Sequence, residues 1–226
     1  MRFDIITIFP EIFDSYFNES IIKRAREKGK IKIKIWNLRD FTKDKHKKVD
    51  DKPFGGGPGM VMKTEPLATA LKSLKIKKKT PVILFSASGK QFNSKIAQSF
   101  VKKFDRIIMI CGHYEGVDER IKSIIRDFGF LLQEMSIGPY ILTGGELPAM
   151  IVVDAISRHI PGVLGKSESL EESRHGVGVP AYTRPEVFKF TIRQAHGKKI
   201  KKYVVPKVLL SGNHKKISEW RAKHKK

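Results

Sequence analysis

Short apolar runs in the sequence alternate with longer stretches in which apolar residues recur every three or four positions. The short runs are rich in Ile and Val and predict strands at 4–9, 32–36, 82–86 and 106–111. The longer stretches have the helical period and predict helices at 11–28, 65–74, 93–103 and 118–126. One more helix is expected from Glu146 to about His159. Such alternation is typical of an α/β fold built on a parallel sheet.

The stretch 135–145 departs from this pattern because it has no charged residue and is rich in glycine and proline. Periodicity alone favours a buried strand, a turn and the start of a helix. The glycine content is too high for an ordinary strand, however, and glycine lets a backbone approach a ligand closely. A slot of backbone amides and carbonyls around Tyr140 and Leu142 would suit a flat, neutral, purine-sized group.

Charge indicates the kind of partner. The 226 residues include 45 Lys and Arg against 23 Asp and Glu, which gives a formal net charge of +22. An anionic partner is expected, with nucleic acid first, although a lysine-rich composition can also make an ordinary enzyme basic. The hydrophobic content of 40% is enough for one medium domain and a smaller appendage.

A single cysteine, Cys111, excludes an internal disulfide and favours a reducing compartment. It follows an apolar run, so a buried core residue is a better interpretation than a nucleophile. No apolar stretch approaches the length of about 18 residues that spans a membrane, and the N-terminal residues do not have the pattern of a secretory signal. We therefore expect a cytoplasmic protein with no membrane partner.

Composition changes near the C-terminal end. The stretch 165–180 is rich in Ser, Glu and Gly without an apolar period, which predicts an exposed linker. The stretch 181–226 is short and strongly basic, and its lysine clusters suit either nucleic-acid contacts or a solvated tail. The predicted organisation is a first domain at 1–164, a linker at 165–180 and a small basic domain at 181–226.

Three segments together resemble one protein family. They are CGHYEGVDER at 111–120, VDDKPFGGGPGM at 49–60 and the glycine-rich segment 136–149. They resemble the bacterial tRNA (guanine-N1)-methyltransferases, the TrmD family of the knotted SPOUT superfamily. The match runs nearly collinearly from Ile5 to Trp220, and further matching pieces lie at 39–42, 157–165, 182–187 and 208–214.

The resemblance implies a fold that local patterns do not report, since threaded chains are almost absent from proteins. It implies a parallel α/β sheet flanked by helices with a deep trefoil knot, plus a small basic helical C-terminal domain that binds tRNA. The knot loops correspond to 85–89, 111–116 and 136–142 and would hold S-adenosylmethionine bent. The resemblance also implies a homodimer with the active site between its two chains, and no DNA partner.

The resemblance assigns candidate residues by position. The expected cofactor-binding residues are Phe85, Ser86, Gly89, Gly112, Tyr114, Glu115, Ser136, Ile137, Gly138, Tyr140, Ile141, Leu142, Gly144, Gly145 and Pro148. The residues expected to bind the substrate RNA are Asp50, Gly57 and Gly59. For Tyr114, packing in the core is the alternative role.

Two other kinds of site have less support. The glycines at 55–59 could cradle phosphates, but Met60 follows them where a P-loop needs a lysine and a hydroxyl residue. The seven histidines are scattered without the spacing of metal ligands, so no protein-bound metal is expected. Assistance by Mg²⁺ is implied by the resemblance only.

Methyl transfer to guanine N1 requires removal of the N1 proton. A carboxylate can act as general base, and a nearby arginine can stabilise negative charge on O6. The resemblance places an arginine at Arg158, although Arg158 could instead form a helix-surface ion pair with Asp154 four residues earlier. It places the base in the linker, where this chain has Glu171 and Glu172 before Ser173 and the family has an aspartate before the serine.

The glutamate has two interpretations. Its extra methylene can be offset by a linker that is one residue shorter, in which case Glu172 is the base; or the site has lost accurate placement of its carboxylate. Pro139 also replaces a family aspartate near the cofactor.

The expected function is methylation of N1 of the guanosine 3′ of the anticodon in tRNA. The alternatives are a knotted methyltransferase of ribosomal RNA and a noncatalytic RNA-binding protein, which cofactor binding would separate.

Overall fold

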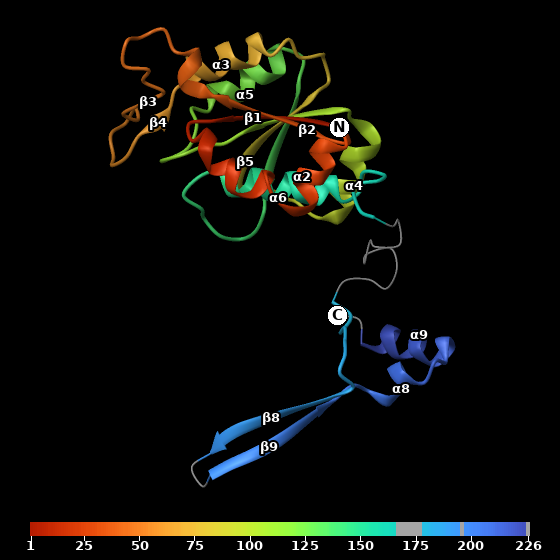
Figure 1. Cartoon of the computed structure of the whole chain (residues 1–226). Coiled ribbons are helices and arrows are strands. Elements are labelled where there is room, and N and C mark those ends of the chain that lie inside the picture. Colours follow the sequence, from red (N-terminus) through yellow and green to blue (C-terminus); the bar gives the residue numbers. More distant parts are fainter. Residues whose placement is uncertain (166–177, 195–196, 225–226) are drawn as a thin grey trace. The chain divides into compact units, whose positions relative to one another are not determined.

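The structure, a computed structural model, describes residues 1–165, 178–194 and 197–224 (Figure 1). The chain forms two compact units, a larger one at Met1–Gly165 and a smaller one at Lys166–Lys226. In the described residues no helix is both long and apolar enough to cross a lipid bilayer.

The larger unit is built on a five-stranded sheet in the order β2-β1-β6-β5-β7, in which every neighbouring pair is parallel. Its strands are β1 (Arg2–Thr7), β2 (Lys32–Asn37), β5 (Pro81–Gln91), β6 (Arg106–Ile110) and β7 (Leu131–Ser136). The prediction of a parallel α/β sheet is therefore confirmed. Periodicity had indicated only the end of β7, because polar Gln133 and Glu134 interrupt its apolar residues.

Helices cover both faces of this sheet (Figure 1). One face carries α3 (Thr64–Ser73) and α5 (Arg120–Asp127), and the other carries α2 (Ser20–Glu27), α4 (Ser94–Lys103) and α6 (Glu146–Ser157). Successive strand residues point to opposite faces. Ile107 and Met109 of β6 accordingly belong to one buried cluster, while Ile108 and Ile110 belong to the other. Both faces are buried, which explains why the central strands are apolar runs.

The predicted helix at 11–28 is wrong as a continuous element. The structure divides it into a 3₁₀ turn η1 (Pro10–Phe13), a short α1 (Asp14–Phe17) and α2. The break falls after Phe17, and Ser20, the first residue of α2, has a positive φ of 48° that differs from the φ of a continuous right-handed helix. The remaining short elements are η2 (Leu38–Phe41) and the antiparallel pair β3 (Asp50–Asp51) and β4 (Val61–Met62).

The smaller unit is not purely helical as expected. It contains an antiparallel hairpin of β8 (Val187–Gln194) and β9 (Gly197–Val204), followed by α8 (Lys207–Leu210) and α9 (His214–Lys223). The hairpin has a physical cause in the sequence, because Phe188, Phe190 and Ile192 alternate with other residues at the period of a strand. The helix α9 begins at Asn213, whose side chain accepts a hydrogen bond from the Lys216 amide.

A buried carboxylate on β1 is hydrogen-bonded to side chains of β1 and of both neighbouring strands, β2 and β6. Asp4 is fully buried and accepts hydrogen bonds from Arg2, Trp36 and Arg106, with oxygen to nitrogen distances of 2.7 to 2.8 Å. Burial would raise the pKa of Asp4, but the hydrogen bonds from these three side chains outweigh it and hold the pKa below its usual value. The folded protein therefore favours the ionised form of Asp4.

We expect Asp4→Asn to lower the free energy of unfolding at pH 7 by about 2–3 kcal/mol. This is below the cost of about 3–5 kcal/mol for breaking a fully buried pair, because Arg2 is 34% exposed. A lowered folded-state pKa means that the contribution of Asp4 is present above the unfolded-state pKa and is lost as the pH falls below about 4. Urea unfolding followed at pH 7 and at pH 3 measures both effects. A difference between wild type and variant that does not shrink in acid would contradict the assigned charge.

Candidate active site

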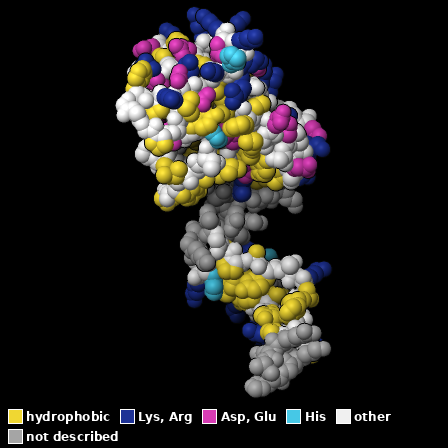
Figure 2. All heavy atoms as spheres, turned by 90° about the vertical axis from the view of Figure 1, so that its left-hand side faces the viewer, with side chains coloured by type: hydrophobic (Ala, Val, Ile, Leu, Met, Phe, Trp, Pro, Cys, Tyr) yellow, Lys and Arg dark blue, Asp and Glu magenta, His cyan; other side chains and the backbone are white. Residues whose placement is uncertain are grey.

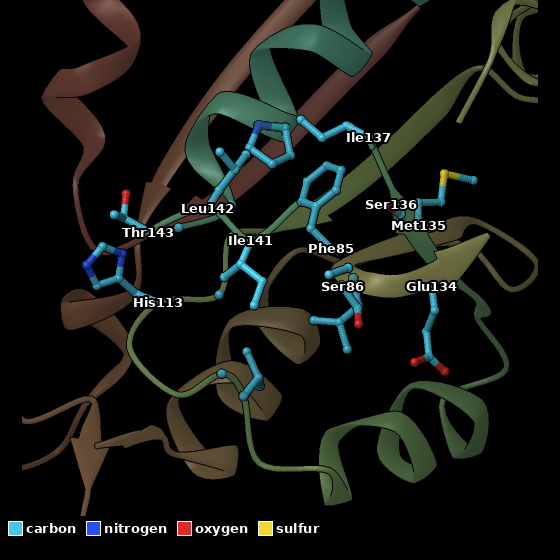
Figure 3. Close-up of a pocket in the computed structure, with 18 of the residues that line it drawn as sticks. Phe85, Ser86, His113, Glu134, Met135, Ser136, Ile137, Ile141, Leu142 and Thr143 are labelled. Atoms are coloured by element: carbon cyan, nitrogen blue, oxygen red, sulfur yellow. The ribbon is translucent and has the colours of Figure 1, made fainter. Parts of the chain in front are cut away.

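A cavity of about 380 Å³ lies in the larger unit, where the segments that follow β6 and β7 meet the irregular part of β5 (Figure 3). In open α/β sheets ligands bind at the carboxyl ends of the strands. All but one of the expected cofactor residues line this cavity: Phe85, Ser86, Gly112, Tyr114, Glu115, Ser136, Ile137, Gly138, Tyr140, Ile141, Leu142, Gly144, Gly145 and Pro148.

Gly89 is the exception, because it does not line the cavity. A Cβ at Gly89 would come within 2.6 Å of the backbone nitrogen of Met135 in β7. The pairing of β5 with β7 changes register between Phe85 and Lys90, so the two strands cross closely at this point. Gly89 therefore permits the approach of the two strands that carry the cavity walls.

The segment after β7 is attached to the segment after β6 by backbone contacts. The Gly145 amide donates a hydrogen bond to the Gly112 carbonyl at 2.9 Å, and His113 and Gly144 form an isolated antiparallel bridge. A Cβ at Gly145 would lie 2.5 Å from the Cα of Cys111. Only glycine fits there, because a Cβ would meet backbone atoms that cannot rotate away.

Two buried side chains support this loop. The Ser136 hydroxyl donates to the Gly138 carbonyl at 2.8 Å and accepts from the Gly138 amide at 3.2 Å. At the other end of the loop, the Thr7 hydroxyl donates to buried Glu146 at 2.7 Å.

Cys111 is fully buried. Burial, and to a smaller extent the nearby charge of Glu146, raises the pKa of its thiol well above the usual value. Cys111 is thus a core residue, as expected, and not a thiolate nucleophile.

Part of the cavity wall is apolar. Phe85 stands in the middle of the view, with Ile137, Ile141 and Leu142 around it (Figure 3). Ile141 is 90% exposed and Tyr140 is 52% exposed, although both belong to a loop fixed at its two ends. Exposed apolar side chains around a cavity provide contact area for an apolar ligand group.

A charged group that was not predicted lies at one end of the cavity. Lys122 of α5 donates to Glu119 and to Glu134 of β7, with both nitrogen to oxygen distances at 2.7 Å. The hydrogen bonds to Glu119 and then Glu134 raise the pKa of Lys122. All three residues line the cavity, and Glu134 lies away from His113 and Thr143, which occupy the opposite end (Figure 3). The helical spacing of Glu119 and Lys122 was visible in the sequence, but the partner on β7 was not.

His113 also lines the cavity. It belongs to the segment 111–116 that the resemblance assigned to the cofactor, although it was not among the residues named individually. Its ring lies edge-on to Phe9 with the ring centroids 5.0 Å apart. Its Nδ1 is buried and has no hydrogen-bond partner within the described part of the chain. Tyr114, for which packing was the alternative, is 45% exposed and has an edge contact with His113.

The expected RNA-binding residues are only partly brought to the cavity. Gly59 lies against Glu115, whose side chain occupies the space that a Cβ at Gly59 would need, and the Glu115 amide donates to the Met60 carbonyl. Gly57 has open space around it, and Asp50 lies in β3. None of Asp50, Gly57 and Gly59 lines the cavity itself, and Gly59 reaches it only through its contact with Glu115.

Arg158 does not line the cavity of its own chain. Pro148, in the first turn of α6, lines it, and Arg158 caps the opposite end of the same helix. Ten residues of helix separate them by about 15 Å. Asp154, the alternative partner of Arg158, accepts a hydrogen bond from the Tyr16 hydroxyl at 3.0 Å. Glu171 and Glu172 lie outside the described residues, and within those residues no group of three or more His, Cys, Asp or Glu could hold a metal ion.

Comparison with known proteins gives a uniform result. The chain matches the family model described as tRNA (Guanine-1)-methyltransferase TrmD over residues 1–226. It is 53% identical to a protein of Dictyoglomus turgidum over 226 residues, which cover 99% of this chain and 84% of that protein. It is 51% identical to a protein of Clostridioides difficile over 227 residues, which cover 98% and 90%. Both relatives are named tRNA (guanine-N(1)-)-methyltransferase. The resemblance is confirmed, and the chain belongs to the tRNA (guanine-1)-methyltransferase TrmD family.

Proposed function

We propose that this chain transfers a methyl group from S-adenosylmethionine to N1 of the guanosine 3′ of the anticodon in tRNA. One observation carries the proposal. A chain of this family has a cavity, and one wall of the cavity is the glycine-rich loop 136–145, which is anchored to the segment after β6. We further propose that the enzyme acts in the cytoplasm and that Mg²⁺ assists it.

The residues of the cavity suit S-adenosylmethionine. Phe85, Ile137 and Leu142 offer an apolar surface for the purine, and the backbone of Gly138 and Gly144 can be approached closely. The charged group around Lys122 and Glu134 suits the polar parts of the molecule. When bound, S-adenosylmethionine supplies a methyl group made electrophilic by the positively charged sulfur.

The protein must prepare guanine N1, which carries a proton at neutral pH. We assign Glu172 the role of accepting this proton, with Glu171 as the alternative, because a carboxylate within about 3 Å can act as general base. Arg158 would stabilise the negative charge that develops on O6 as the proton leaves. The glutamate places its carboxylate one methylene further from the backbone than the family aspartate.

The position of Arg158 supports a homodimer. Because the cavity and Arg158 lie at opposite ends of α6, one chain does not bring them together, and a second chain has to supply one of them. The outer side of α6 exposes Leu147 and Ile151, and the neighbouring η1 exposes Ile12. An apolar surface of this kind on a helix and its neighbour favours burial against a second copy.

A trefoil knot also remains part of the proposal. Its support is the attachment of the loop 136–145 to residues 111–113, which places the segment after β7 against the segment after β6. These are two of the three segments that the resemblance assigns to the knot.

The test of the function is methyl transfer from labelled S-adenosylmethionine to unmodified tRNA transcripts that differ only in guanosine or adenosine 3′ of the anticodon. We expect transfer to the guanosine transcript alone. Transfer to ribosomal RNA fragments but not to tRNA would support the related knotted enzymes instead. S-adenosylmethionine binding without any transfer would leave a noncatalytic RNA-binding protein.

Mixed dimers test whether two chains complete one active site. A chain with Gly145→Ala has a defective cavity, and a chain with Arg158→Ala lacks the arginine, so each is expected to be inactive alone. After unfolding and refolding together, half of the dimers are mixed and each has one intact site, which restores about a quarter of wild-type activity. Mixtures that stay inactive, although mixed dimers are detected by mass, would show that the cavity and Arg158 have to belong to the same chain.

A further inference from the structure

The hairpin of the smaller unit carries exposed aromatic rings. In an antiparallel pair, residues directly opposite each other share a face. Phe188 pairs with Tyr203 and Phe190 pairs with Lys201, so these four residues form one face, here called the aromatic face. The three rings are 51%, 45% and 54% exposed for Phe188, Tyr203 and Phe190. Figure 2 shows hydrophobic side chains gathered on one side of this unit.

The rings of the aromatic face have similar inclinations. The planes of Phe188 and Phe190 are inclined by 26° with their centroids 6.0 Å apart, and the planes of Phe188 and Tyr203 by 33° with their centroids 6.3 Å apart. The ammonium of Lys201 lies 5.2 Å from the centroid of Tyr203. Three rings of similar inclination beside a cation form a platform, and each of the three rings is about half exposed.

The charge of the hairpin restricts the partner. The segment 187–204 contains five lysines and one arginine and no acidic residue. A second copy of this chain, with its net charge of +22, is a poor partner for such a surface. A polyanion is a good one, and exposed aromatic side chains with lysines around them are what proteins use to stack unpaired bases of RNA.

We propose that the aromatic face binds unpaired bases of RNA by stacking. Lys201 on the same face contacts the phosphates beside them, and Lys189 and Lys202 on the opposite face attract the RNA backbone at longer range. The inference rests on the proposed function only in taking tRNA as the natural RNA, in which single-stranded loops offer such bases. A two-stranded hairpin alone is marginally stable in water. Contact with RNA thus also stabilises the hairpin.

The test uses the full chain with Phe188→Leu and Phe190→Leu combined, which keeps apolar side chains but removes the rings. We expect affinity for an unmodified tRNA transcript to fall by about 5- to 100-fold, since one stacked base is worth about 1–3 kcal/mol. The double change to tyrosine should keep affinity within about threefold of wild type, because tyrosine also stacks. The matched control is Val187→Ala with Val204→Ala, a cross-strand pair of the opposite face, which should leave affinity unchanged.

Salt and RNA structure separate stacking from charge. The leucine variant should keep the wild-type slope of log affinity against log salt concentration, whereas Lys201→Gln with Lys202→Gln should reduce that slope by about 1 to 2. A single-stranded oligonucleotide should protect the hairpin amides from hydrogen exchange, and a duplex of equal length should not. Equal protection by both would overturn the stacking proposal.

Failure of the aromatic-face proposal can be distinguished from failure of the proposed methyltransferase function. If wild type methylates tRNA while the leucine variant binds tRNA as tightly as wild type, the aromatic face has no role in RNA binding and the methyltransferase function stands. If wild type methylates nothing but the leucine variant loses RNA affinity, the function fails and the aromatic face stands. A change of oligomeric state at unchanged RNA affinity would identify the face as a protein contact and overturn the proposal.

Discussion

Glu172→Gln is expected to lower the single-turnover rate of methyl transfer by about 10² to 10⁴-fold, the usual contribution of a general base. The amide keeps the size and polarity of the side chain but cannot accept the N1 proton of guanine. Affinity for S-adenosylmethionine should stay within about threefold of wild type, because the role proposed for this glutamate is removal of a proton from the RNA base and not binding of the cofactor. Rapid mixing with labelled S-adenosylmethionine and excess enzyme measures the rate, and calorimetry measures the affinity.

The neighbouring residue provides the control. Glu171→Gln makes the same chemical change one position earlier and should lower the rate by less than about tenfold, as expected for a side chain that only adds negative charge nearby. A collapse with Glu171→Gln and not with Glu172→Gln would exchange the two roles. Rates that stay high in both variants would show that neither linker carboxylate removes the proton.

Glu172→Asp separates the two interpretations of the linker. It shortens the side chain by one methylene and creates the acidic-aspartate-serine pattern of the family. If the shorter linker offsets the longer glutamate, the aspartate variant should be slower by about 10²-fold, the cost of a misplacement of about 1 Å. A faster variant would mean that the glutamate is the misplaced group.

Much of the fold could be predicted because both faces of the sheet are buried. Strands such as β6, with four consecutive buried apolar residues at Ile107–Ile110, stand out in any hydropathy pattern. The helices that cover the sheet show an apolar stripe, as in α4, where Ala97 and Phe100 are buried. Local sequence and tertiary burial agree in these elements, which is why the prediction was correct there.

The prediction failed where one residue or one pairing decides the structure. The apolar period of 11–28 continues across the break, and the positive φ of Ser20 leaves no trace in that period. The hairpin β8–β9 was not predicted, because the resemblance implied a helical domain and the strand period of Phe188 and Phe190 covers only one short segment.

The site divides in the same way. Motifs rich in glycine identify cavity residues, because the absence of a side chain is what the site requires at positions such as Gly145. The ion pair of Lys122 with Glu134 depends on the packing of α5 against β7, which the sequence does not encode locally. Arg158 is separated from the cavity because the two lie at opposite ends of α6. Neither the glycine-rich motif nor the segment around Arg158 indicates this separation by itself.

Gly145→Ala is expected to abolish most S-adenosylmethionine binding. The new Cβ would lie 2.5 Å from the Cα of Cys111 and 3.0 Å from the amide nitrogen of Gly112, and neither backbone atom can move independently. Overpacking of this kind costs about 1–3 kcal/mol, and the loop can relieve it only by moving away from residues 111–113. The displaced loop then has to return to its place when S-adenosylmethionine binds, and this cost lowers the affinity for S-adenosylmethionine by about 5- to 150-fold. Isothermal titration calorimetry measures this affinity.

Gly165→Ala is the matched control. It adds the same methyl group at the end of the larger unit, where a Cβ would meet no atom within 4 Å and the backbone is not in the left-handed region. Its affinity and thermal unfolding temperature should equal those of wild type. If Gly145→Ala binds S-adenosylmethionine as tightly as this control, the ligand does not depend on the attachment of the loop to residues 111–113.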